Sequence, residues 1–139
     1  MPTPKPALLA PLLRSTAAHV AFAALAMGGW ALFANRGHGL GRAALACLVQ
    51  GLLSGAITFG LKRSLEAMAA RVTGVAAVLL PPLVTCAVVL IVLLGVHRLA
   101  GTPEVWRTIA VPYAVSSTYA FVYCLGLYGA RRRAEGRAS

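Results

Sequence analysis

The chain has 139 residues, and 59% of them are hydrophobic while only 12% are charged. A soluble domain is usually about half apolar and about a quarter charged, so this composition excludes an ordinary soluble domain. The net charge of +10 would indicate nucleic-acid binding in a soluble protein. Here the basic residues flank apolar segments, and we expect no nucleic-acid partner.

Four long segments contain no Asp, Glu, Lys or Arg, namely residues 15–35, 43–61, 72–97 and 108–130. A helix needs about 20 apolar residues to cross the hydrocarbon core of a bilayer. The segments lack the polar and apolar alternation of membrane strands, and they are about twice as long as such strands. The sequence therefore predicts an all-α polytopic membrane protein with four transmembrane helices arranged as two antiparallel hairpins.

The N-terminal residues 1–14 contain four prolines and are predicted to form a short arm outside the helical domain. Lys5 and Arg14 precede the first apolar segment as in a signal peptide, and residues 24–26 offer a candidate cleavage site. The apolar segment is nevertheless long enough to span a membrane, so we expect it to be retained as the first helix. The domain, residues 15–130, is expected to contain helices at about 15–34, 42–62, 72–98 and 106–130, followed by a basic tail at 131–139.

The connections between these helices differ in character. Residues 35–41 read NRGHGLG, and their three glycines predict a tight turn between the first two helices. Residues 62–72 read KRSLEAMAARV, in which apolar residues recur at helical spacing, and this pattern predicts an amphipathic turn on the membrane surface. Thr102-Pro103-Glu104 predicts the start of the last helix.

The distribution of basic residues predicts the orientation. Nine of the thirteen Lys and Arg residues lie in the N-terminal arm, the 62–71 connector and the tail, and four lie in the other two connections. The positive-inside rule then places both termini in the cytoplasm. Trp30 and Trp106 fall at the opposite boundary, where aromatic residues are enriched. We expect an integral protein of the bacterial cytoplasmic (inner) membrane.

The second predicted helix carries a stripe of small residues, formed by Ala43, Cys47, Gly51 and Gly55. Small residues spaced by four allow two helices to approach closely in a membrane. The partner helix is expected in the same chain, and the alternative is a helix of a second copy.

The two halves of the chain show a limited similarity. A shift of 65 residues superposes Arg42 on Arg107, Gly51 on Ser116 and Gly55 on Ala120. The hairpins could be parallel repeats, but Ala and Gly are common in membrane helices, so duplication and chance similarity both stay open.

Pro81 and Pro82 are adjacent within the third predicted helix. Because proline has no N–H, the carbonyls of Ala77 and Val78 lose their helical partners. The hydroxyl of Thr85 would bond back to Pro81. We expect a helix kink here, which either improves packing or marks a broken helix at the midplane, where transporters bind substrate.

Polar uncharged side chains form two lines on the predicted helices. The first line consists of Gln50, Ser54 and Thr58, and the second of Ser116, Tyr119 and Tyr123. Together they could form a neutral groove that binds substrate or lipid, and the alternative is hydrogen bonding between helices. Other candidates near the membrane boundaries are His19, Arg42 and Arg107. His38 and His97 flank the outer loops, and we expect loop solvation at both.

Acidic residues are scarce, since the chain has no Asp and only Glu66, Glu104 and Glu135. All three fall in predicted connections or in the tail, whereas proton- and cation-coupled pumps need a carboxylate within the membrane. Paired-carboxylate catalysis and carboxylate-held metal sites also lose their ligands. We therefore expect no enzymatic activity, no metal and no cofactor.

These observations favour a small membrane protein that handles or translocates an anionic lipid or lipid-linked substrate, because basic residues at the membrane boundary can hold phosphate groups. The architecture is similar to that of small membrane proteins proposed to flip lipid-linked sugars, and the likeness is one of architecture alone. The expected partners are anionic membrane lipids and either further copies of the chain or a larger membrane complex. The alternatives are a non-catalytic subunit or assembly factor and, third, a small channel or pore.

Overall fold

The computed structural model describes residues 15–138, which form four long helices and one turn of 3₁₀ helix. The elements are α2 (Thr16–Ala34), η1 (Arg36–His38), α3 (Leu40–Ala69), α4 (Ala76–Leu99) and α5 (Val105–Ala138). All four long helices are apolar and long enough to cross a membrane. The prediction of an all-α chain with four such helices is confirmed, and the helices indicate an integral membrane protein. The predicted arm at residues 1–14 lies outside the described residues.

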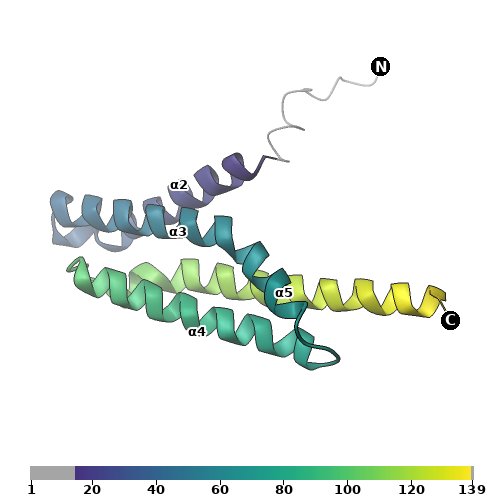
Figure 1. The fold of residues 1–139 in the computed structure, drawn as a ribbon. Helices are drawn as coiled ribbons and strands as arrows, with labels where there is room; N and C mark the ends of the chain where they lie inside the picture. The colour runs from purple at the N-terminus through teal and green to yellow at the C-terminus, as the bar shows by residue number, and fades with distance from the viewer. Residues whose placement is uncertain (1–14, 139) are drawn as a thin grey trace, which may run out of the picture.

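The helices pack as two consecutive pairs, α2 with α3 and α4 with α5 (Figure 1). The turns within the two pairs, residues 35–39 and 100–104, lie at one end of the molecule, which we call the turn end. Here Nε1 of Trp30 donates a hydrogen bond to the carbonyl of Arg107 at 2.9 Å. The link between α3 and α4, residues 70–75, lies at the opposite end beside the C-terminal part of α5 (Figure 1), and we call this the connection end.

The third element, α3, is longer than predicted and continues to Ala69. Most of the 62–71 segment is therefore part of a helix, and the prediction of a separate surface turn is wrong. The apolar residues of this segment extend the buried side of α3, because fully buried Leu65 packs with Ala120 of α5. As a consequence, Glu66 lies in a membrane-length helix instead of a connector.

The last helix, α5, is also longer than predicted and includes residues 131–138 of the predicted tail. Seven of these eight residues are Arg, Ala or Glu, which are good helix formers. Arg131 also donates from Nη1 to the carbonyl of Ala69 at 2.9 Å, and this bond ties α5 to the C-terminal end of α3. A cation is favourable at that position because unpaired carbonyls gather at the end of a helix.

The fourth element, α4, begins at Ala76, after Gly74 adopts a positive φ of 61° in the preceding turn. Pro81 and Pro82 consequently lie in the second turn of the helix, and α4 continues through both as one helix to Leu99. A broken helix at the midplane is not found in α4, while a kink at the prolines stays a prediction. The expected bond from Thr85 to Pro81 is absent, since the Thr85 hydroxyl has no hydrogen-bond partner.

Small residues bring α2 and α3 into close contact. A Cβ added at Gly51 would lie 3.1 Å from the carbonyl oxygen of Ala24 in α2. A Cβ added at Gly28 of α2 would lie 2.9 Å from the carbonyl oxygen of Cys47 in α3. The small-residue stripe of α3 therefore faces α2 of the same chain, and Gly28 extends this contact from the other side.

The packing does not repeat the 65-residue similarity. Gly55 lies against Val20 of α2, within its own helix pair. Its counterpart Ala120 packs on Leu61 and Leu65 of α3, in the other pair. The two positions thus have different neighbours, which favours chance similarity over duplication.

Candidate functional site

A buried polar cluster joins α3 to α4 near the turn end. His97 is 0% exposed, and its Nε2 donates to Oε1 of Gln50 at 2.8 Å. Gln50 in turn donates from its own Nε2 to the hydroxyl of Ser54 at 2.8 Å. The hydroxyl of Thr102 lies 2.8 Å from Nδ1 of His97, so both ring nitrogens have partners. The prediction that His97 is solvated by the loop is wrong, because its side chain is fully buried against α3 and bonded to Gln50.

A second polar cluster joins α2 to α5 at the turn end. Nδ2 of the fully buried Asn35 donates to the hydroxyl of Thr108 at 2.8 Å. Oδ1 of Asn35 accepts from the backbone N–H of Glu104 at 3.0 Å. The Glu104 carboxylate pairs with Nε2 of His38 at 3.0 Å on the exposed side of the cluster. These contacts fix the two helix pairs to each other, since buried polar groups that are hydrogen-bonded specify a packing arrangement.

The two predicted polar lines do not form one groove. Gln50 and Ser54 are buried and bonded within the His97 cluster, while Thr58 is half-buried. Ser116 is also buried, and its hydroxyl donates to the carbonyl of Pro112 in its own helix at 2.8 Å. Within residues 15–138, no hydrogen bond joins one line to the other. Gln50 therefore takes part in hydrogen bonding between helices, the alternative that the sequence left open, whereas Ser116 bonds only within α5.

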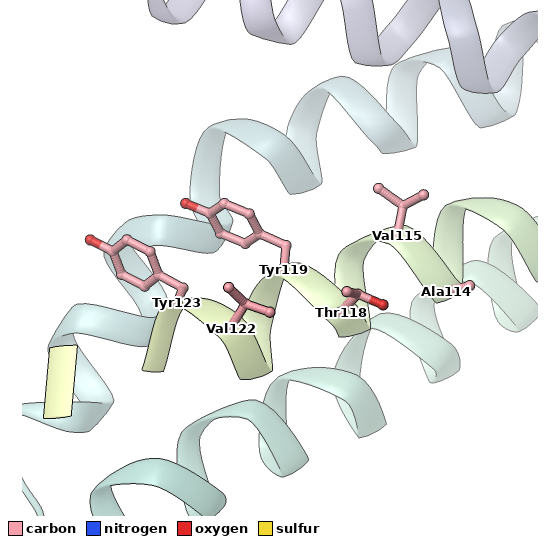
Figure 2. Close-up of a pocket in the computed structure, with 6 residues that line it drawn as sticks. All are labelled: Ala114, Val115, Thr118, Tyr119, Val122 and Tyr123. Atoms are coloured by element: carbon pink, nitrogen blue, oxygen red, sulfur yellow. The ribbon is translucent and has the colours of Figure 1, made fainter. Parts of the chain in front are cut away.

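An open apolar hollow of about 530 Å³ lies along α5 (Figure 2), and we call it the α5 hollow. Its lining residues are Ala114, Val115, Thr118, Tyr119, Val122 and Tyr123. The two tyrosine rings stack with centroids 5.5 Å apart and planes 12° apart, and they point in the same direction (Figure 2). At the connection end of the hollow, the Tyr123 hydroxyl donates to Oε1 of Glu66 at 2.5 Å.

Basic residues gather at the connection end of the molecule, and one of them, Lys62, is linked to the α5 hollow through Glu66 and Tyr123. Nζ of Lys62 lies 3.9 Å from Oε1 of Glu66, so this carboxylate is shared between a cation and a tyrosine hydroxyl. The same end of the molecule also carries six exposed arginines, which lie at the end of α3, in the link to α4 and in the last turns of α5. They are Arg63, Arg71, Arg131, Arg132, Arg133 and Arg137. The site therefore changes along its length from an apolar surface to a cationic rim.

The remaining candidate residues lie away from this site. His19 is exposed, and its Nδ1 donates to the carbonyl of Ser15 in the preceding turn at 2.9 Å. Arg42 and Arg107 are exposed at the turn end, the opposite end of the molecule from the cationic rim. None of these three residues lines the α5 hollow.

Within residues 15–138, no group of three or more His, Cys, Asp or Glu side chains is placed to hold a metal ion. Comparison of the chain with protein-family models, with curated proteins and with solved structures finds no match. A function for this chain therefore has to be proposed from its own residues and their geometry.

Three important residues were not predicted as parts of these sites. His97 could have been found, because it continues the spacing of four residues set by Val89 and Leu93, which are buried in α4. The place of Glu66 could have been predicted as well, because the apolar spacing of residues 62–72 is also that of a continuing second helix. Asn35 gives no such signal, because polar residues are expected in any tight turn.

Proposed function

We propose that the chain is an inner-membrane protein that binds and handles an anionic lipid or lipid-linked substrate. In this proposal the two helix pairs cross the membrane as antiparallel hairpins, with both termini and the connection end in the cytoplasm. The orientation rests on the excess of Lys and Arg at the connection end. The observation that carries the proposal is the α5 hollow, whose apolar surface leads to the cationic rim.

The hollow and the rim match the two parts of a phospholipid. An acyl chain could lie against Val115 and Val122, which are both exposed to the surroundings of the bundle. The phosphate group would then reach Lys62 and Arg131 at the membrane surface, where each basic residue contributes about 1 kcal/mol of attraction to anionic lipid. Glu66 would not repel the phosphate strongly, because its carboxylate already faces Lys62 and Tyr123.

The buried polar clusters favour lipid binding on the side of the bundle over passage of a head group through its interior. Gln50, Ser54 and His97 already satisfy one another's hydrogen bonds. A polar head group entering between α3 and α4 would have to break these contacts, and each unpaired buried group costs about 1–3 kcal/mol. A handling role, in which the lipid stays at the surface of the bundle, requires no such rearrangement.

The proposal predicts that filling the α5 hollow weakens lipid binding. Val122→Trp places a large side chain in the hollow and should lower the retention of phosphatidylglycerol about tenfold, the effect of losing about 1.4 kcal/mol of binding. The measurement is native mass spectrometry of protein released from vesicles with equal amounts of phosphatidylglycerol and phosphatidylcholine. The wild type should retain phosphatidylglycerol preferentially.

The matched control is Ile91→Trp, which adds the same side chain to an exposed position of α4 outside the hollow. It should retain lipid like the wild type. Lys62→Gln combined with Arg131→Gln should reduce the preference for phosphatidylglycerol while leaving phosphatidylcholine retention unchanged. Equal retention by the wild type and Val122→Trp would contradict binding in the hollow.

A second candidate function is a non-catalytic subunit of a larger membrane complex. The α5 hollow is open and nearly free of polar groups, and the apolar side of a partner helix could also occupy it. In that case mild extraction should yield a complex of defined mass, and Val122→Trp should release the partner instead of a lipid.

A further inference from the structure

Aromatic and basic residues of α2, η1 and α5 lie in a row at the turn end. The indole Nε1 of Trp30 donates to the carbonyl of Arg107 at 2.9 Å, which fixes the ring beside the first turn of α5. The centroids of the Trp30 and Phe33 rings are 5.8 Å apart. The guanidinium of Arg36 lies over the Phe33 ring, 3.9 Å from its centroid. We call these four residues the turn-end row.

The two arginines of the turn-end row keep donors that no carboxylate uses. Both arginines are exposed, and within residues 15–138 neither forms a salt bridge. Arg36 donates from Nη1 to the carbonyl of Phe33 at 3.3 Å. Since a guanidinium has five N–H donors, the others stay available to a ligand. The acidic residue at this end, Glu104, already pairs with His38 at 3.0 Å.

An exposed apolar strip runs along α2 from the turn-end row toward the middle of the helix. Its members are Phe22, Ala26, Gly29 and Phe33, which share one side of the helix because they follow the spacing of i, i+4, i+7 and i+11. Phe22 is 73% exposed and Phe33 is 51% exposed, so neither ring is covered by another helix. A Cβ added at Gly29 would meet no atom within 4 Å, and the strip is therefore open between its two rings.

We propose that the turn-end row binds the phosphate group of an anionic phospholipid in the leaflet opposite the cationic rim. The row lies where two membrane-length helices meet their turns, and tryptophan is enriched at that boundary. Arginine suits a phosphate because its planar fork donates two parallel hydrogen bonds. Stacking on an aromatic face, as at Arg36, leaves the N–H groups at the edge of the guanidinium free. The site is separate from the α5 hollow and does not depend on lipid binding there.

The surroundings of the turn-end row favour a lipid over a soluble anion. A soluble anion would pair with the two arginines and leave the apolar strip of α2 uncovered, whereas a lipid meets both through its phosphate and its acyl chains. Arg42 and Arg98 are exposed at the same end, but within residues 15–138 neither lies over an aromatic ring. These two arginines therefore provide the comparison, since they carry the same charge without the aromatic support.

The first test is native mass spectrometry of the full chain released from vesicles with equal amounts of phosphatidylglycerol and phosphatidylcholine. The wild type should retain two phosphatidylglycerol molecules, one at the turn-end row and one in the α5 hollow. Arg36→Gln combined with Arg107→Gln should lower retention of the first at least about tenfold, because two cations are lost from the phosphate site. Val122→Trp should remove only the second. If the wild type retains one lipid that Val122→Trp keeps and the arginine variant loses, the turn-end site stands and the lipid site of the α5 hollow is wrong.

The matched control for this test is Arg42→Gln combined with Arg98→Gln. It removes the same charge from the same end of the molecule and should retain lipid like the wild type. Equal losses in the control and in the Arg36 and Arg107 variant would show a general effect of charge and would overturn the proposal. Unchanged retention by the Arg36 and Arg107 variant, or no phosphatidylglycerol on the wild type, would also overturn it.

A second test reads the site in a bilayer through the fluorescence of Trp30. Trp106→Phe leaves Trp30 as the only tryptophan, since the chain has two. In phosphatidylcholine vesicles, a small fraction of brominated phosphatidylglycerol should quench Trp30 at least about twice as strongly as the same fraction of brominated phosphatidylcholine, because the anionic lipid gathers at the arginines. Arg36→Gln with Arg107→Gln should abolish this difference and leave quenching by brominated phosphatidylcholine unchanged, which shows that the helix stays folded. Equal quenching by the two lipids before the arginines are replaced would contradict the site.

Discussion

At the scale of single residues, the His97 side chain holds α3 and α4 together through Gln50. Replacing His97 with Leu leaves the amide oxygen of Gln50 and the hydroxyl of Thr102 buried without their partner. We expect the free energy of unfolding to fall by about 1–3 kcal/mol, because an unsatisfied buried polar group carries its full desolvation cost. Unfolding in mixed micelles with increasing denaturing detergent would measure the loss.

The double variant His97→Leu with Gln50→Leu separates the hydrogen bond from the packing. Replacing both partners with apolar residues removes the unsatisfied amide, so the double variant should recover the part of the loss that comes from Gln50, while the Thr102 hydroxyl stays without its partner. A control is His38→Ala, whose pair with Glu104 is partly exposed, and a change below about 1 kcal/mol is expected there. Equal stability of His97→Leu and the wild type would show that the buried bond contributes nothing.

The sequence predicts which residues share one side of a helix better than it predicts the partner of a polar side chain. The line of Gln50 and Ser54 was identified from spacing alone, but its partner His97 lies 47 positions away along the chain. Periodicity reports which residues share one side of a helix, whereas a contact between helices depends on their rotation and depth. For this reason the spacing places the residues of each polar line correctly on helices. It does not predict how the lines lie relative to each other, and within residues 15–138 no hydrogen bond joins them.

At the scale of helices, the contact of α2 with α3 depends on the absence of one side chain. Gly28→Ala would place a Cβ 2.9 Å from the carbonyl oxygen of Cys47, and backbone cannot yield as a flexible side chain can. We expect a loss of about 1–3 kcal/mol in the free energy of unfolding, which is typical of overpacking. The adjacent Gly29→Ala is the matched control, since an added Cβ there meets open space and alanine favours the helix. Equal stability of the two variants in detergent unfolding would show that the helices can separate freely at Gly28.

The helices themselves follow from the sequence, but their ends do not. Four charge-free segments are enough to predict four helices, because the hydrocarbon core sets a minimum apolar length. A criterion based on charge-free segments ends a predicted helix at the first charged residue. It therefore places the end of the second helix at Lys62, whereas α3 continues to Ala69. A helix can continue into the head-group region for as long as one side stays buried, as Leu65 and Ala69 do in α3. The end of such a helix depends on tertiary contacts that periodicity alone does not contain.

At the scale of the whole molecule, the arrangement of the helices separates two kinds of surface. The turn end carries the Asn35 and His97 clusters, which fix the helix pairs to each other. The connection end carries the cationic rim, and the α5 hollow leads toward it along α5. The proposed lipid site at the α5 hollow needs this arrangement to have one orientation in the membrane. A lipid of the cytoplasmic leaflet reaches the rim only if the connection end is cytoplasmic.

The orientation can be tested with single cysteines at the two ends of the bundle. Gly37→Cys lies at the turn end and Gly136→Cys near the end of α5, and both positions are exposed with open space around them. A membrane-impermeant thiol reagent added to intact spheroplasts should label Gly37→Cys at once and Gly136→Cys only after the membrane is opened, because the cationic end stays on the cytoplasmic side. The wild type serves as the control, since Cys86 and Cys124 are buried and Cys47 packs against Gly28. The reverse labelling pattern would place the cationic rim outside the cell, away from the anionic lipids of the inner leaflet, and the proposed lipid site at the α5 hollow would then be wrong.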